Sequence, residues 1–210
     1  MKYKEVENKK FNREKCEEAV KMLLESFGED VNRPGLLETP HRVAGYWEEL
    51  LEGSEYTNAE IAEMCGKSFE VGYDPIVTIW DENIFSHCEH HLALMYEGTA
   101  VVAYIPVKNP DGTYKVLGLS KIYRIIDLCS RRLQLQEKLA ADISECISLA
   151  TGSTRVYVNL NMKHGCVSAR GVKAQGSTNV AYMTDELRHN AALRDEFERK
   201  ASELVARNRK

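Results

Sequence analysis

One short stretch, Ser86-His87-Cys88-Glu89-His90-His91, gathers a thiol, a carboxylate and three imidazoles. Within it, Cys88 and His91 stand at Cys-x-x-His spacing, and thiolate with imidazole is a donor set that suits zinc. Another thiol lies far downstream, in His164-Gly165-Cys166. Three protein ligands leave one position of the zinc tetrahedron open, which is typical of catalytic sites. The pattern therefore predicts a hydrolytic zinc site held by Cys88, His91 and Cys166.

Two histidines beside these ligands, His90 and His164, are free for proton transfer. Zinc lowers the pKa of a bound water toward about 7, and an imidazole donates and accepts protons in the same range. The alternative is that one of them only orients a metal ligand. The residues alone leave both interpretations open.

Other chemistries fit the cysteines and histidines less well. His87-Cys88-Glu89 matches the H-x-E of zinc nucleobase deaminases, but the P-C-x-x-C that those enzymes also need is absent from the sequence. A disulfide between Cys88 and Cys166 is disfavoured because no apolar leader is visible at the N-terminus, so we expect a cytoplasmic protein with reduced thiols. The remaining cysteines are interpreted as ordinary core residues: Cys16, Cys65, Cys129 and Cys146.

Cations gather near the start of an expected helix that begins at Ser120, at Lys121 and Arg124, with Arg170 and Lys173 further along. A helix N-terminus with nearby lysine and arginine favours phosphate, although a solvated basic face would show the same residues. The net charge of −4 over 210 residues argues against a nonspecific nucleic-acid binder. No apolar run reaches the roughly 20 residues that a membrane span requires.

The elements that must position these residues change from helical to strand periodicity and back. An expected strand at 155–167 presents residues two apart on one face, which places His164, Cys166 and Arg170 together. The order predicts an α+β fold with an antiparallel sheet. We expect helices at 12–27, 39–53 and 185–207, a helical hairpin at 119–152 with Ser120 as its cap, strands at 69–71, 76–80 and 99–106, and a loop at 171–179.

Six segments in this order resemble GTP cyclohydrolase I, over about residues 14–178. They are Glu-Thr-Pro-His-Arg-Val-Ala at 38–44, Cys-Glu-His-His at 88–91, Val-Val-Ala-Tyr-Ile-Pro at 101–106, Gly-Leu-Ser-Lys-Ile-x-Arg-Ile at 118–125, Ser-Arg-Arg-Leu-Gln-Leu-Gln-Glu-Lys-Leu at 130–139 and His-x-Cys-x-x-x-Arg-Gly-Val at 164–172. The resemblance implies a tunnelling fold (T-fold), with an N-terminal helical extension at 1–66 and a catalytic domain at 67–210. It also implies a toroidal homodecamer with active sites at subunit contacts.

The resemblance further implies that GTP and water yield formate and 7,8-dihydroneopterin triphosphate. A zinc-bound water would attack C8 of the purine, before ring opening, ribose rearrangement and ring closure. The implied roles are as follows: zinc ligation by Cys88, His91 and Cys166; protonation of N7 by His164; proton shuttling by His90; the ribose step by Ser120; the guanine edge by Gln136 and Glu137; and the triphosphate by Lys121, Arg124 and Arg170, with Arg42 from a neighbouring subunit.

Two segments depart from the family pattern. Leu92-Ala93-Leu94-Met95 lacks the usual proline after His91, and the tail Thr178–Met183 replaces a threonine-rich one. The alternatives are a paralogue that only opens the purine ring or acts on another purine nucleotide, and a non-catalytic, zinc-stapled oligomer that binds nucleotide.

Overall fold

The structure, a computed structural model, describes residues 10–208. The predicted α+β class is confirmed, with helices around two sheets. The helices are α1 Arg13–Ser26, α2 Thr39–Leu50, the 3-10 helix η1 Glu52–Glu55, α3 Asn58–Met64, α4 Leu119–Ser130, α5 Gln136–Thr151, α6 Gly165–Ser168, α7 Asp185–Arg188 and α8 Ala191–Asn208. The strands are β1 Ser68–Val71, β2 Val77–Cys88, β3 Leu94–Tyr104, β4 Val107–Lys108, β5 Tyr114–Leu117, β6 Leu133–Gln134, β7 Val156–His164 and β8 Thr178–Met183.

A five-stranded sheet in the order β6-β2-β3-β7-β8 forms the centre of the molecule. All its neighbours pair antiparallel except β6, which runs parallel to β2. β2 and β3 start in register at Val77 and Tyr104, and two bulges near Ile84 shift them toward the Cys88 end. Gly98 lies opposite that kink, where a Cβ would be 2.4 Å from the carbonyl oxygen of Ile84. A side chain is therefore excluded there, and the two strands bend together.

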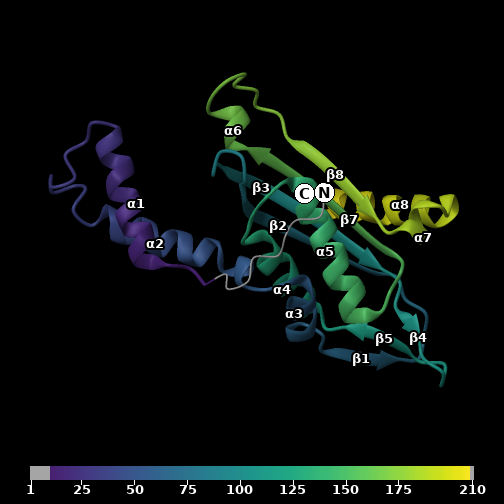
Figure 1. Cartoon of the computed structure of the whole chain (residues 1–210). Coiled ribbons are helices and arrows are strands. Elements are labelled where there is room, and N and C mark those ends of the chain that lie inside the picture. Colours follow the sequence, from purple (N-terminus) through teal and green to yellow (C-terminus); the bar gives the residue numbers. More distant parts are fainter. Residues whose placement is uncertain (1–9, 209–210) are drawn as a thin grey trace.

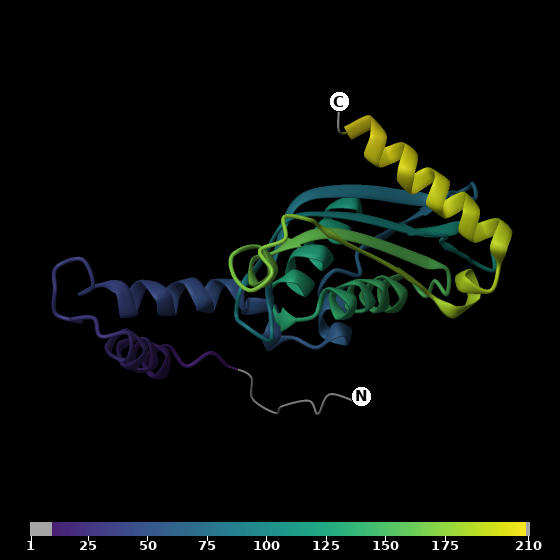
Figure 2. The ribbon, with the colours of Figure 1, turned by 90° about the horizontal axis from the view of Figure 1, so that it is seen from above.

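Helices cover both faces of this sheet. Side chains of β3 alternate between two cores, so that Val102 packs with α4 and α5 while Val101 packs with α8 through Phe197. Figure 2 shows the sheet between α5 on one side and α8 on the other. The expectation that the apolar strand at 99–106 is buried on both faces is therefore correct, since Ala100 to Tyr104 are all buried.

Helices α1 and α2 form a hairpin that projects away from the sheet (Figures 1 and 2). α1 has no buried residue, and α2 buries only Pro40 and Ala44. The hairpin meets the body near Trp47, whose ring lies 4.9 Å from that of His87. The predicted boundary between residues 1–66 and 67–210 stays a prediction, and residues 1–9 and 209–210 of those two units lie outside the described range.

Four local predictions differ from the structure. The strand expected at 155–167 ends at His164, and a helical turn, α6, follows it. β8 occupies part of the segment expected to be a loop, because Thr178 to Met183 pair with β7. The single helix expected at 185–207 is divided in two, since the side chain of Asn190 accepts the backbone N–H of Leu193 and begins a new helix. Ser120 lies inside α4, whose N-cap is Gly118.

No helix within residues 10–208 has the length and apolar character that crossing a membrane would need.

Candidate metal centre and active site

The end of β2 and the turn after it fix Cys88 and His91. Cys88 pairs with Gln134 of β6, its backbone N–H donates to the carbonyl of Ala93 at 2.9 Å, and its carbonyl accepts from the N–H of Leu92 at 2.9 Å. Leu92 adopts a positive φ of 53°, which closes the turn tightly. The turn thus carries His91 back toward the thiol three residues before it.

A second segment brings Cys166 to the same place. β7 ends at His164, which pairs with Met95 of β3, and the chain then forms the single helical turn α6. Gly165 lies against β3 so closely that a Cβ would be 3.0 Å from the carbonyl oxygen of Leu94. This close approach seats Cys166 over the end of the sheet.

Cys88, His91 and Cys166 form one cluster, as predicted. Their ligand atoms all lie within 4.8 Å of one another. The thiol of Cys88 is buried, that of Cys166 is half-buried, and the His91 ring is exposed. Burial raises the pKa of the Cys166 thiol, and the neighbouring Cys88 thiol raises it further. A cation placed among these atoms would reverse that effect and favour the thiolates. Two sulfurs and one nitrogen suit zinc.

Polar residues surround the cluster on its open side. Nη1 of Arg170 donates to Nε2 of His91 at 3.2 Å, and the ring of His90 lies 6.3 Å from that of His91. Ser168 donates its hydroxyl to the carbonyl of His164 and contacts the hydroxyl of Tyr96 at 3.0 Å. Arg170 and both adjacent histidines are exposed, so a ligand can reach them.

His164 stands between this cluster and the start of α5. Its Nε2 lies 2.8 Å from Oε1 of Gln136, which is 1% exposed. Burial lowers the pKa of His164, and the carboxylate of Glu137 opposes that shift. Because Glu137 is itself exposed, a carboxylate free to accept hydrogen bonds lies beside a half-buried imidazole.

Comparisons with known proteins agree with this arrangement. The family model described as GTP cyclohydrolase I matches residues 16–202. GTP cyclohydrolase 1 of Clostridium acetobutylicum is 47% identical over 166 residues, covering 77% of this chain and 82% of that protein. GTP cyclohydrolase 1 of Clostridium beijerinckii is 43% identical over 195 residues, covering 90% and 96%. This chain belongs to the GTP cyclohydrolase I family. The crystal structure of the apo archaeosine synthase QueF-Like matches with a TM-score of 0.40 and 19% identity, over 52% of this chain and 92% of that chain.

In this member of the GTP cyclohydrolase I family, the predicted phosphate ligands on α4 lie far from the metal cluster. Tyr123 donates its hydroxyl to the carbonyl of Trp80 at 3.2 Å, so the start of α4 lies beside the early part of β2. From Trp80 to Cys88 the strand covers about 26 Å at about 3.3 Å per residue. Ser120, Lys121 and Arg124 are therefore at the other end of the sheet from Cys88.

Arg42 is also remote from the cluster within one chain. It is exposed. It lies five residues before Trp47, so Arg42 is about 7.5 Å further out along the helix axis than Trp47. Figure 2 shows that α2 begins at the outer end of the projecting hairpin. Eight of the twelve predicted site residues lie at or beside the cluster within one chain. The other four lie elsewhere; they are Arg42, Ser120, Lys121 and Arg124.

Sequence reasoning named Gln136 and His164 but missed their contact with each other, and it did not assign Ser168 or Tyr46 to the site. The contact between Gln136 and His164 joins residues 28 positions apart, and no local pattern reveals it. The hydroxyl of Ser168 donates to the carbonyl of His164, four residues earlier. This spacing is that of a helix, so a prediction of helix α6 would have indicated the contact. Tyr46, whose hydroxyl lies 3.2 Å from Nε2 of His87, gave no signal.

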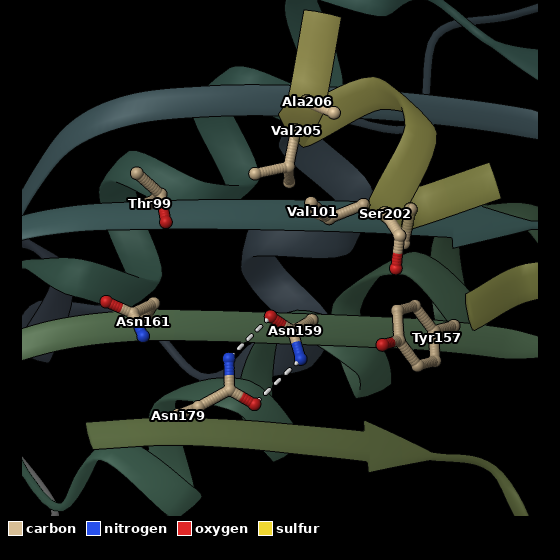
Figure 3. Close-up of a pocket in the computed structure, with 10 residues that line it drawn as sticks. Thr99, Val101, Tyr157, Asn159, Asn161, Asn179, Ser202, Val205 and Ala206 are labelled. Carbon is tan, nitrogen blue, oxygen red and sulfur yellow. Dashed lines mark hydrogen bonds between the residues drawn. The ribbon is translucent and has the colours of Figure 1, made fainter. Parts of the chain in front are cut away.

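A cavity of about 650 Å³ lies between α8 and the face of the sheet that α8 covers. Figure 3 shows Asn159 and Asn179 facing each other across β7 and β8, and each amide donates to the other, at 3.1 and 3.0 Å. None of the predicted site residues lines this cavity. The cavity under α8 is therefore separate from the predicted site residues.

Proposed function

We propose that this chain is a GTP cyclohydrolase I that converts GTP and water to formate and 7,8-dihydroneopterin triphosphate. The observation that carries the proposal is the cluster of Cys88, His91 and Cys166, with His164 two residues before Cys166 and its ring held by Gln136. Family membership over residues 16–202 supports it. A non-catalytic zinc-stapled oligomer would not require the proton-transfer histidines to stand next to the ligands. The cytoplasmic location of this chain stays a prediction.

Cys88, His91 and Cys166 would hold the zinc ion. When bound, zinc supplies a Lewis acid that makes water a nucleophile at neutral pH. The burial of Cys88 and the fixed backbone of the turn after it hold the donor atoms in place before any metal arrives. This preorganisation is what distinguishes the cluster from a chance gathering of cysteine and histidine.

The chain's own residues would bind and protonate the purine. The exposed carboxylate of Glu137, at the start of α5, would accept hydrogen bonds from the guanine edge. His164, next to Glu137, would donate a proton to N7 as C8 is attacked. His90, exposed beside the ligand His91, would carry protons to and from solvent during ring opening.

The remaining predicted residues would reach the substrate from a neighbouring copy of the chain. Arg170 already lies at the cluster through His91, whereas Lys121, Arg124 and Ser120 lie at the far end of β2. A triphosphate needs several cations, and those of α4 that were predicted to hold it lie away from the cluster within one chain. We therefore propose a homo-oligomer, with a decamer expected, in which Arg42 and the start of α4 complete a neighbour's site.

The test is a turnover assay with GTP and metal analysis on the same sample. We expect zinc near one equivalent per chain, formate release, and a fluorescent pterin after oxidation and dephosphorylation. Cys166→Ala should abolish formate release and lower the zinc content, whereas Cys16→Ala, which removes a thiol on α1, should leave both unchanged. Zinc-loaded wild-type protein that releases no formate from GTP would reject the proposal.

A mixing experiment tests the shared site. Arg42→Ala and Cys166→Ala should each be inactive alone, because each lacks a different part. Unfolding and refolding the two variants together should restore activity, since some sites then combine an intact Arg42 with an intact Cys166. If mixed oligomers form and stay as inactive as the separate variants, the two residues serve the same chain.

A further inference from the structure

The side chain of Gln136 is enclosed by three partners at the start of α5. Its Nε2 donates to the backbone carbonyl of Leu160 at 3.1 Å and to that of Thr178 at 3.0 Å. Its Oε1 lies 2.8 Å from Nε2 of His164. With 1% of its surface exposed, this amide cannot exchange these contacts for water.

These contacts permit only one orientation of the amide. A backbone carbonyl accepts hydrogen bonds and never donates them, so the amide nitrogen has to face Leu160 and Thr178. The amide oxygen then faces His164, and an oxygen can only accept from that ring. Nε2 of His164 must therefore carry a hydrogen. The assignment follows from the two carbonyls and not from the histidine itself.

The frame that holds the amide is rigid. Leu160 lies on β7 and pairs with Val180 of β8, and Thr178 pairs with Met162 in the same ladder. His164 is four residues beyond Leu160 on β7. Helix α5, both strands and the imidazole are thus joined through one side chain, and the ring is held while a substrate arrives.

We propose that Gln136 is a positioning residue that holds His164 in the Nε2–H form, so that Nδ1 is the nitrogen that exchanges a proton with the purine. Within residues 10–208, Nδ1 of His164 forms no hydrogen bond, which leaves it open to a ligand. In the transfer, the Nδ1–H bond of the imidazolium breaks and an N–H bond forms at N7. His164 is left neutral with its remaining hydrogen on Nε2. This inference rests on the proposed function.

A guanine-anchoring role for the same amide predicts a different result. Both amide hydrogens of Gln136 are already donated to the sheet, so contact with guanine would require those bonds to break. Guanine recognition then falls to Glu137, whose carboxylate is exposed. The two roles separate experimentally, because an anchor affects binding of GTP and a positioning residue affects the chemical step.

The first experiment compares kcat and GTP affinity in Gln136→Met. We expect kcat to fall about 10- to 100-fold, the range seen when a functional histidine loses its hydrogen-bonded partner. The Kd for GTP, measured by equilibrium dialysis with the metal-free protein, should stay within about twofold of wild type. A Kd at least tenfold higher with kcat unchanged would overturn the proposal in favour of the anchor.

A double-mutant cycle tests whether Gln136 acts through His164. In a His164→Ala background, Gln136→Met should cause no further loss of kcat, because the ring it positions is gone. The matched control is Gln134→Met, which removes another buried amide two residues away. The Gln134 amide donates to Ser86 and to the carbonyl of Cys129, and not to His164. Any loss of kcat in Gln134→Met should therefore add to the loss in His164→Ala. A fully additive loss for Gln136→Met would contradict the proposal.

A turnover-independent measurement separates this inference from the proposed function. Nitrogen-15 NMR of ring-labelled histidine distinguishes the two neutral tautomers, and the His164 signals are assigned by their loss in His164→Ala. We expect Nε2–H in wild type and a mixture in Gln136→Met. If that variant does not fold, the wild-type spectrum alone decides, because it needs no substitution at position 136. An Nδ1–H form in wild type would refute the inference whether or not GTP is turned over.

Discussion

Arg132 gives the sharpest prediction about stability. Its guanidinium donates to the carbonyls of Gly53 and Tyr56 at 2.9 Å each, to Oδ1 of Asn58 at 2.7 Å and to Oδ2 of Asp142 at 2.8 Å. The Arg132 and Asp142 side chains are 11% and 8% exposed. One residue in the turn between α4 and α5 therefore fixes η1 and the start of α3.

Arg132→Met removes all four hydrogen bonds while keeping an apolar side chain of similar length. Breaking a buried ion pair from one side destabilises a protein by about 3–5 kcal/mol. We expect the lower end, about 3 kcal/mol, because Lys138 also contacts the Asp142 carboxylate and partly compensates it. For a chain of this size about 3 kcal/mol corresponds to a fall in Tm of about 6–12 °C.

The assay is thermal unfolding followed by circular dichroism, at one fixed protomer concentration because assembly also contributes to Tm. The control is Arg199→Met. Arg199 forms a 2.7 Å ion pair with Glu203 on α8, but both side chains are at least half exposed, so its loss should cost no more than about 0.5 kcal/mol. If the two variants lower Tm equally, the buried network does not hold the segment as argued.

Three further predictions concern a close backbone approach, a buried aromatic side chain and a partly buried carboxyl group. Gly53→Ala should destabilise the protein by about 1–3 kcal/mol in urea unfolding, because the added Cβ would lie 1.8 Å from the carbonyl oxygen of Leu128. The control is Gly72→Ala, whose Cβ would have no atom within 4 Å and should not destabilise the protein. Equal urea midpoints for the two variants would contradict this prediction. Phe197→Ala, fully buried under the sheet, should cost about 3–5 kcal/mol in the same assay, and a loss below about 1 kcal/mol would show that α8 is not part of the core. Burial raises the pKa of the Asp81 carboxyl, so its contribution to stability is present at low pH and is lost as pH rises through the folded-state pKa. Asp81→Asn should thus raise the urea midpoint at pH 7 but not at pH 3; a gain of equal size at both would exclude this cause.

The local spacing in the sequence was enough to predict that two of the three clustered side chains lie together. Cys88 and His91 are three residues apart, and a turn brings such residues together whatever the rest of the fold. Cys166 was also predicted to join them, and it does lie in the cluster, but the prediction assumed the wrong local structure. It reaches the cluster through a helical turn, because Gly165 packs on Leu94, and that contact joins segments about 70 residues apart.

Other features were not predictable because they depend on distant partners. Thr178 to Met183 form a strand by pairing with β7, a partner that lies apart from them in the sequence. Lys121 and Arg124 follow a clear pattern for anion binding, yet one chain places them at the opposite end of β2 from Cys88. The α+β order of elements, in contrast, follows from periodicity within each segment and is confirmed.

The two cysteines of the metal cluster stand 78 residues apart in the chain. An ion bound by both would tie β2 to α6 as a removable crosslink. In the chain-entropy description, closing a loop of about 80 residues lowers the entropy of the unfolded chain, which raises the free energy of unfolding by about 4.5 kcal/mol. The same three side chains that prepare a nucleophile would thereby also fasten the open end of the sheet, and the ease of unfolding would depend on the free metal concentration.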